Sequence, residues 1–221
     1  MFIKSITGGE KGSSVCVTLA DEHTGGVERL FISQKLWALI SDGIGALTPV
    51  DELLYDKLRS AAGKTSALRE ASRMIGYGEK SKREIERRLS SKKIPTDAAK
   101  WAVAMLEKNG YLDEESSCAR IAESAVASKH YGRRRVLEYL LTHGYEKSAA
   151  TEAVEEIPDE SYRAALEYNI DHKFPDIAQY DLKERQKATA ALMRLGFSGG
   201  EIADAIRERR RTVGDSPQAP T

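Results

Sequence analysis

The chain has 221 residues, 34 lysines and arginines against 34 aspartates and glutamates, and 41% hydrophobic residues. A globular chain of this length buries roughly 70% of its unfolded surface, so it can fold without disulfides, metals or cofactors. No stretch approaches the roughly 20 apolar residues of a membrane span, and the first residues lack the basic and then apolar order of a signal peptide. The sequence therefore predicts a cytoplasmic protein with no cofactor and no membrane partner.

The charge is distributed unevenly along the chain. Residues 1–64 carry a net charge of −1, residues 65–150 carry +5, and residues 151–221 carry −4. A total of zero argues against a protein that coats DNA through its overall charge. The basic middle still predicts a surface that faces an anionic partner. The two cysteines, Cys16 and Cys118, lack metal-ligand spacing and are interpreted as reduced, small apolar residues of the core.

Three short strands are predicted at the N-terminus. β-Branched and aromatic residues alternate with polar ones over residues 2–7, 14–20 and 27–32, and glycine-rich breaks lie between these runs. Val15, Val17 and Leu19 fall on one face, which gives the small sheet a side to bury. Such a sheet is marginal alone, so we expect it to pack on a helix over residues 33–42. Residues 1–64 are predicted to form one β-rich element with its connecting helices.

Helical patterns dominate after residue 48. Thr48 followed by Pro49 predicts a capped helix start, and leucines follow at helical spacing. Beyond residue 65 a unit repeats three times: a β-branched or small residue, a leucine, a helix-stop position and an apolar residue, with offsets of 51 and 52 between copies. The three copies are Ile85/Leu89/Lys93/Ile94, Val136/Leu140/Gly144/Tyr145 and Ala188/Leu192/Gly196/Phe197.

Each copy is followed by a second predicted helix and preceded by a third, over residues 67–75, 113–128 and 159–173. The predicted fold is therefore mostly α: tandem three-helix repeats that form an elongated curved array, with the small N-terminal β-hairpin or sheet element attached. The repeats span residues 65–112, 113–158 and 159–211, and residues 212–221 are predicted to be a disordered tail.

Four motifs carry a resemblance to a known family. Residues 81–89 read Ser-Lys-Arg-Glu-Ile-Glu-Arg-Arg-Leu, and residues 109–115 read Asn-Gly-Tyr-Leu-Asp-Glu-Glu. Tyr131-Gly132 opens the second repeat unit, and Arg194-Leu195-Gly196-Phe197-Ser198 closes the third. In order and spacing, over about residues 65–210, these motifs resemble the RecX family, bacterial regulators of the RecA recombinase.

Catalytic and metal-binding motifs are incomplete in this sequence. Gly63-Lys64-Thr65 resembles the end of a phosphate-binding P-loop, but Leu58 stands where that motif needs glycine. The four histidines have no metal-ligand spacing, and Asp113, Glu114 and Glu115 open a predicted helix, where acidic groups act as caps. The sequence therefore predicts a protein that is not an enzyme.

Two basic strips are the candidate partner-binding or DNA-binding surface. Arg83 and Arg87 stack like charges four residues apart, which folding alone does not require. The alternative is an ordinary solvated face, and the Glu84–Arg88 and Arg134–Glu138 spacings favour it. The candidate residues are Lys82, Arg83, Arg87, Arg88, Lys92, Lys129, Arg133, Arg134 and Arg135.

The resemblance implies a regulator of homologous recombination, DNA repair and the SOS response. Such a protein would bind, as a monomer, in the groove of the RecA filament on single-stranded DNA, and would suppress ATP hydrolysis, strand exchange and filament extension. Two alternatives stay open from the residues themselves. One is a stand-alone DNA-binding helical protein, and the other is a helical scaffold for an unrelated protein.

Overall fold

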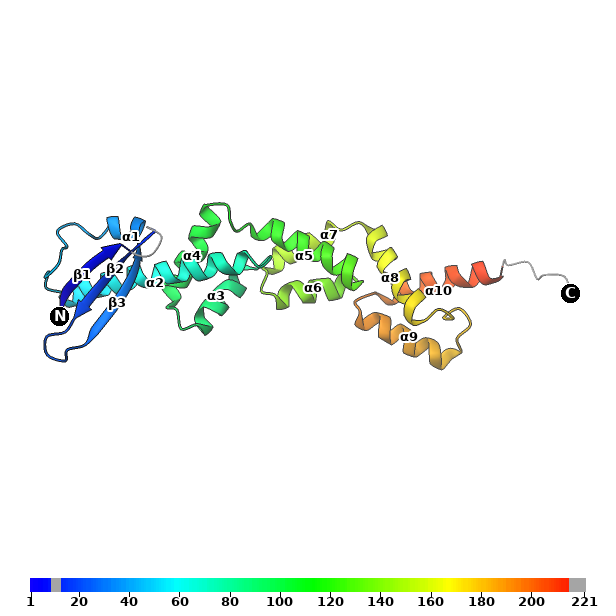
Figure 1. The fold of residues 1–221 in the computed structure, drawn as a ribbon. Helices are drawn as coiled ribbons and strands as arrows, with labels where there is room; N and C mark the ends of the chain where they lie inside the picture. Colours follow the sequence, from blue (N-terminus) through cyan, green and yellow to red (C-terminus); the bar gives the residue numbers. More distant parts are fainter. Residues whose placement is uncertain (9–12, 215–221) are drawn as a thin grey trace. The chain divides into compact units, whose positions relative to one another are not determined.

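The computed structural model describes residues 1–8 and 13–214, with side chains up to residue 212. The chain divides into two compact units, Met1–Asp113 and Glu114–Thr221, which are described separately. Unit 1 holds a three-stranded sheet and four helices among these residues, and unit 2 holds six helices (Figure 1). The prediction of a mostly helical protein with a small N-terminal sheet is confirmed.

The sheet of unit 1 consists of β1 Phe2–Gly8, β2 Ser14–Ala20 and β3 Val27–Ser33, in the order β1-β2-β3 and antiparallel throughout. Val17 lies opposite Ile6 on one side and Leu30 on the other. One face is buried, as the alternating pattern predicts, because period-two side chains point to one side of the pleat. The buried side chains include Ile3, Val17, Leu19, Leu30 and Ile32.

The connection from β3 to the long helix of unit 1 differs from the prediction. Helix α1 is short, Gln34–Ala38, and is capped by Ser33, whose hydroxyl accepts from the Leu36 amide. Thr48 does not cap the next helix: its carbonyl accepts from the Ile3 amide at 3.0 Å, so this segment runs beside β1. Asp51 is the cap instead, its carboxylate accepting from the Leu54 amide at 2.7 Å.

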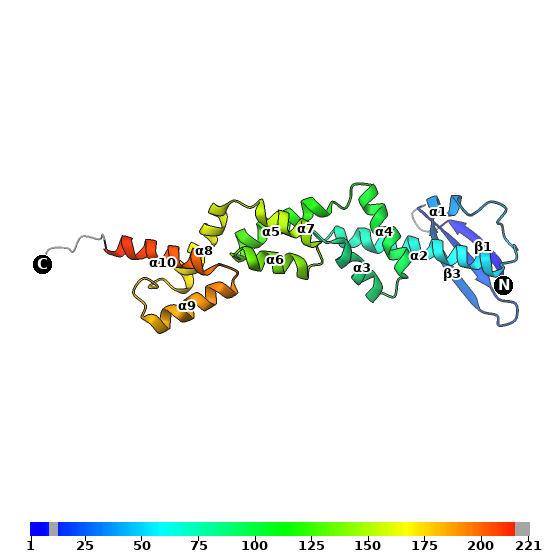
Figure 2. The same cartoon turned by 180° about the vertical axis from the view of Figure 1, so that it is seen from behind.

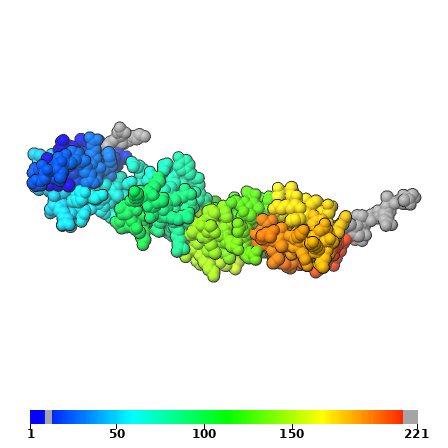
Figure 3. Space-filling model, turned by 90° about the horizontal axis from the view of Figure 1, so that it is seen from below, coloured from blue at the N-terminus to red at the C-terminus, as the bar shows by residue number. Residues whose placement is uncertain are grey.

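Helix α2, Glu52–Ile75, belongs to both halves of unit 1. Its first half packs Leu58 and Ala61 against the sheet. In Figure 3 the cyan atoms of this part of the chain lie against the blue atoms of the N-terminal sheet. Its second half packs Ala67, Ala71 and Met74 against α3 Lys82–Ser91 and α4 Thr96–Lys108 (Figure 2). The predicted domain boundary between residues 64 and 65 therefore falls inside one continuous helix, whose buried residues extend from Leu58 to Met74.

Unit 2 packs its helices around one core. They are α5 Glu114–Lys129, α6 Arg133–Thr142, α7 Lys147–Glu155, α8 Asp159–Lys173, α9 Leu182–Arg194 and α10 Gly199–Gly214. Tyr145 and Tyr162 are its largest fully buried side chains. The first residues of the predicted tail, 212–214, are the last turn of α10, and residues 215–221 lie outside the described part of the chain.

The repeated sequence unit marks the same helix end three times. The helix-stop residues all have positive φ: 60° at Lys93, 87° at Gly144 and 97° at Gly196. After each, the next amide donates to the carbonyl of the leucine five residues before it, a bond that closes a Schellman-type end. The three bonds are Ile94 to Leu89 at 3.2 Å, Tyr145 to Leu140 at 3.2 Å and Phe197 to Leu192 at 3.3 Å.

Two glycines bring the α9–α10 turn against the start of α6. The Gly132 amide donates to the Leu195 carbonyl at 2.8 Å, and the Arg134 amide donates to the Gly196 carbonyl at 3.3 Å. A Cβ atom on Gly132 would lie 2.5 Å from the Gly196 carbonyl carbon. The glycines are therefore needed for the backbones to approach this closely.

Candidate functional site

The α3 basic face begins with a capped helix. The Ser81 hydroxyl accepts from the Glu84 amide at 3.1 Å and starts α3, and the fully buried Ile85 and Leu89 fix which side of the helix faces the core. Arg83 and Arg87 are exposed. Over residues 1–8 and 13–214 neither of these two arginines has an ion-pair partner, so both charges are available to a binding partner.

The other cations of this strip are held by carboxylates. Lys82 reaches Glu107 of α4 at 2.6 Å, Arg88 reaches the nearly buried Glu84 at 2.6 Å, and Lys92 reaches Glu70 of α2. Hydrogen bonds from Lys92 and Arg73 lower the pKa of the Glu70 carboxyl below its ordinary value. Lys82 and Lys92 thus help to join α3 to its neighbours, and their charges are partly used within unit 1.

In the second basic strip, which comprises residues 129 and 133–135, the cations Lys129 and Arg135 lie next to aromatic rings. The Lys129 ammonium donates to the Tyr139 hydroxyl at 2.9 Å and lies 4.1 Å from the centre of that ring. The Arg135 guanidinium lies 5.7 Å from the Tyr131 ring and pairs with Glu138 at 3.2 Å. These cations stay partly exposed, and attraction to the ring faces holds them in place.

Arg133 has a different environment from its two neighbours in sequence. Its guanidinium pairs with Glu201 at 3.0 Å and with Asp159, and it lies 4.2 Å over the Tyr162 ring. Burial raises the pKa of that tyrosine to about 12. Arg133 therefore links α6 to α8 and α10, and this internal role does not favour the predicted role in partner binding.

Arg134, the remaining candidate, donates to the Met193 carbonyl and has Glu138 at 3.9 Å. Its side chain is 59% exposed, so it combines a contact to the end of α9 with an accessible charge. The candidates therefore form two groups, one on α3 in unit 1 and one around α5 and α6 in unit 2.

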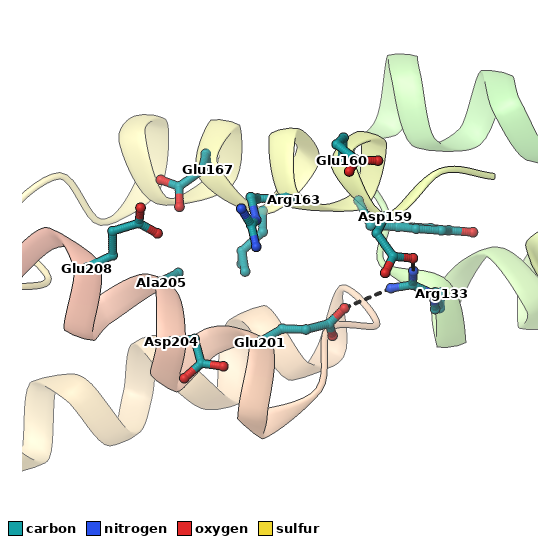
Figure 4. A pocket seen from close by; sticks show the side chains of 11 residues that line it. Arg133, Asp159, Glu160, Arg163, Glu167, Glu201, Asp204, Ala205 and Glu208 are labelled. Atoms are coloured by element: carbon teal, nitrogen blue, oxygen red, sulfur yellow. Dashed lines mark hydrogen bonds and ion pairs between the residues drawn. The ribbon is translucent and has the colours of Figure 1, made fainter.

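An acidic cleft between α8 and α10, shown in Figure 4, was not predicted from the sequence. The cavity has a volume of about 300 Å³, and Arg163 points between its carboxylates. Residues 201, 204 and 208 are acidic and share one helix face, because they are spaced at i, i+3 and i+7. This spacing is visible in the sequence, but the net charge of a whole segment does not reveal it. The acidic residues that line it are Asp159, Glu160, Glu167, Glu201, Asp204 and Glu208.

The acidic cleft has no metal-binding geometry. Glu167 is engaged by Arg209, and Asp159 and Glu201 are engaged by Arg133. In the part of the chain that the structure describes, no three histidine, cysteine, aspartate or glutamate side chains converge as metal ligands.

No helix within the described residues has the length and apolar character that crossing a bilayer requires.

Comparison with known proteins gives a consistent result. No family model matches the chain. The regulatory protein RecX of Stenotrophomonas maltophilia (strain R551-3) is 33% identical over 132 residues, which cover 58% of this chain and 78% of that protein. The regulatory protein RecX of Xanthomonas campestris pv. campestris (strain B100) is 33% identical over 129 residues, with the same coverage.

Two solved structures share the fold. A crystal structure of regulatory protein RecX superposes with a TM-score of 0.72 at 15% identity, covering 94% of this chain and 98% of the other. The crystal structure of RecX from Lactobacillus salivarius superposes with a TM-score of 0.61 at 16% identity, covering 69% and 99%. The first superposition includes most of the residues of both units, so the likeness is not confined to one of them.

Proposed function

The chain belongs to the RecX family of regulatory proteins, and on that premise we propose that it regulates the RecA recombinase. The protein acts as a monomer that binds the groove of the RecA filament on single-stranded DNA. It suppresses ATP hydrolysis, strand exchange and filament extension without chemistry of its own. The observation that carries this proposal is the pair Arg83 and Arg87 on α3, two exposed arginines that form no ion pair among the described residues.

The α3 pair is unfavourable for folding and useful for binding. Like charges four residues apart on a helix cost a few tenths of a kcal/mol, and neither Arg83 nor Arg87 forms an ion pair within the described residues that would offset that cost. An anionic groove would offset it, whether its charge comes from acidic side chains or from phosphates. The affinity should then fall as salt rises, because exposed charges are screened.

The second strip adds a contact from unit 2. Lys129, Arg134 and Arg135 keep accessible charge, whereas Arg133 positions the helices that carry them. We expect Lys82, Arg88 and Lys92 to support α3 and to add to its positive potential.

The test is RecA ATPase activity on single-stranded DNA with the double variant Arg83→Glu, Arg87→Glu. Its matched control is Lys183→Glu, Lys187→Glu, which reverses two exposed cations four residues apart on α9. Wild type and the α9 control should inhibit equally, and the α3 variant should inhibit much less. Equal inhibition by all three proteins would refute the role of α3, and no inhibition by wild type would refute the proposed function.

A second candidate function is that of a stand-alone DNA-binding helical protein. It is favoured by the Lys129, Tyr131 and Tyr139 cluster, which places a cation beside two aromatic rings. Mobility shift with naked DNA at physiological salt, in the absence of RecA, separates the two candidates. Tight binding there with no effect on RecA would favour the second.

A further inference from the structure

A basic pocket lies in unit 1 where α2 ends and α3 ends. Its volume is about 370 Å³, and its lining includes the cations Arg73, Lys80, Arg88 and Lys92. Arg73 and Lys80 are not among the candidate residues chosen from the sequence. Arg73 belongs to α2, and Lys80 belongs to the loop that follows it. Folding therefore brings together cations from three separate segments.

The pocket keeps an excess of positive charge. Arg73 and Lys92 share the single carboxylate of Glu70, and Arg88 pairs with Glu84. The Lys80 ammonium donates to the backbone carbonyl of Glu79 at 3.3 Å, which leaves its charge uncompensated by that contact. Cations near helix C-termini also offset the helix dipole, which accounts for Arg73 and Arg88 but not for Lys80.

An exposed aromatic ring stands beside these cations. Tyr77 lines the same pocket, and 79% of its surface is accessible, so the ring contributes little to the core. A ring face next to several cations is the combination by which proteins hold single-stranded nucleic acid: cations contact the phosphates, and a base stacks on the ring. An acidic peptide would use the cations and leave the ring unused.

We propose that the α2–α3 pocket binds one nucleotide unit of a single strand, with its phosphate on Lys80 and Arg88 and its base against Tyr77. This inference rests on the proposed function, since the single strand in question is the one inside the RecA filament. It adds a direct nucleic-acid contact to the binding of the filament groove.

The test measures binding of a fluorescein-labelled oligothymidylate to the full chain by fluorescence anisotropy, without RecA. Tyr77→Ala should weaken binding roughly tenfold, the usual effect of removing one stacking ring. Lys80→Gln should lower the slope of log affinity against log salt by about 0.7, the effect of one lost phosphate contact on a single strand. The control is Tyr111→Ala, because Tyr111 is 70% exposed and also follows a glycine after a helix.

The outcomes separate this inference from the proposed function. Unchanged oligonucleotide binding by Tyr77→Ala and Lys80→Gln, or an equal loss with Tyr111→Ala, overturns the pocket. Displacement of the labelled oligothymidylate by oligoglutamate but not by thymidine monophosphate also overturns it, in favour of an acidic peptide. Competition by the monophosphate as strong as by the oligonucleotide reassigns the pocket to free nucleotides. Selective loss of oligonucleotide binding supports it, and RecA inhibition is scored separately with the α3 variants.

Discussion

The close approach of Gly132 and Gly196 gives the sharpest stability prediction. Gly132 has φ −80° and ψ 168°, a conformation that alanine adopts freely. An isolated Gly132→Ala change would therefore stabilise the protein by about 0.4–1 kcal/mol, because it restricts the unfolded chain. The surroundings reverse that sign, because the new methyl group would meet backbone and not solvent.

The size of the effect follows from three distances. The alanine Cβ would lie 2.5 Å from the Gly196 carbonyl carbon, 2.6 Å from its oxygen and 2.7 Å from the Phe197 amide nitrogen. These are backbone atoms that cannot rotate away, so the turn must move from α6. Overpacking costs about 1–3 kcal/mol. Weakening the two hydrogen bonds that the Gly132 and Arg134 amides donate to the carbonyls of Leu195 and Gly196 adds about 0.5–1.5 kcal/mol each. We expect a net loss of roughly 2–4 kcal/mol.

Urea unfolding of full-length wild type, Gly132→Ala and Gly199→Ala measures this loss. Gly199 opens α10, and a Cβ atom there would meet no atom of another segment within 4 Å, so Gly199→Ala should stabilise by about 0.4–1 kcal/mol. The two glycine substitutions are thus expected to have opposite signs. A Gly132→Ala variant as stable as wild type would refute the tight backbone contact between α6 and the α9–α10 turn.

Two further predictions concern stability. Lys93 takes φ 60° where the equivalent repeat positions carry glycine, so Lys93→Gly should stabilise by about 1 kcal/mol in thermal or urea unfolding, and a loss of stability would contradict the equivalence of the three helix ends. Burial, with a smaller effect of Glu114, raises the pKa of the Cys118 thiol from 9.0 to about 11. The thiol ionises at a lower pH in the unfolded chain than in the folded protein. Its contribution to the free energy of unfolding is therefore complete below about pH 9 and is lost as pH rises towards 11, at up to about 1.4 kcal/mol per pH unit. Cys118→Ala should therefore flatten the decline in unfolding free energy between pH 9 and pH 11, and an unchanged slope would rule out this cause.

Local signals predicted the strands and the repeated helix ends. Alternation fixes which side of β2 is buried, and a leucine followed by a left-handed residue fixes where α3, α6 and α9 stop. Thr48 shows the limit of such signals. Its pattern is a good helix start, but backbone pairing with Ile3, far away in sequence, holds it extended. Tertiary pairing outweighed the local preference.

The candidate site shows the same division. That Arg83 and Arg87 lie one turn apart on the same helix could be predicted from their spacing in the sequence. The internal role of Arg133 could not, because its partners Asp159 and Glu201 come from two later helices. The acidic cleft was missed for the same reason, since α8 and α10 each supply only part of its carboxylates.

Helix α2 has a consequence for how unit 1 can be divided. The Thr65 hydroxyl donates to the Ala61 carbonyl and accepts from the Ser33 amide, both at 2.9 Å, so the middle of the helix is fastened to the end of β3. The sheet and the α3–α4 pair share this one helix and cannot be separated by a cut in a linker. The N-terminal sheet is thus an inseparable part of the unit that carries the α3 arginines, and a shortened chain starting at residue 65 would begin in mid-helix with one of its two packing partners missing.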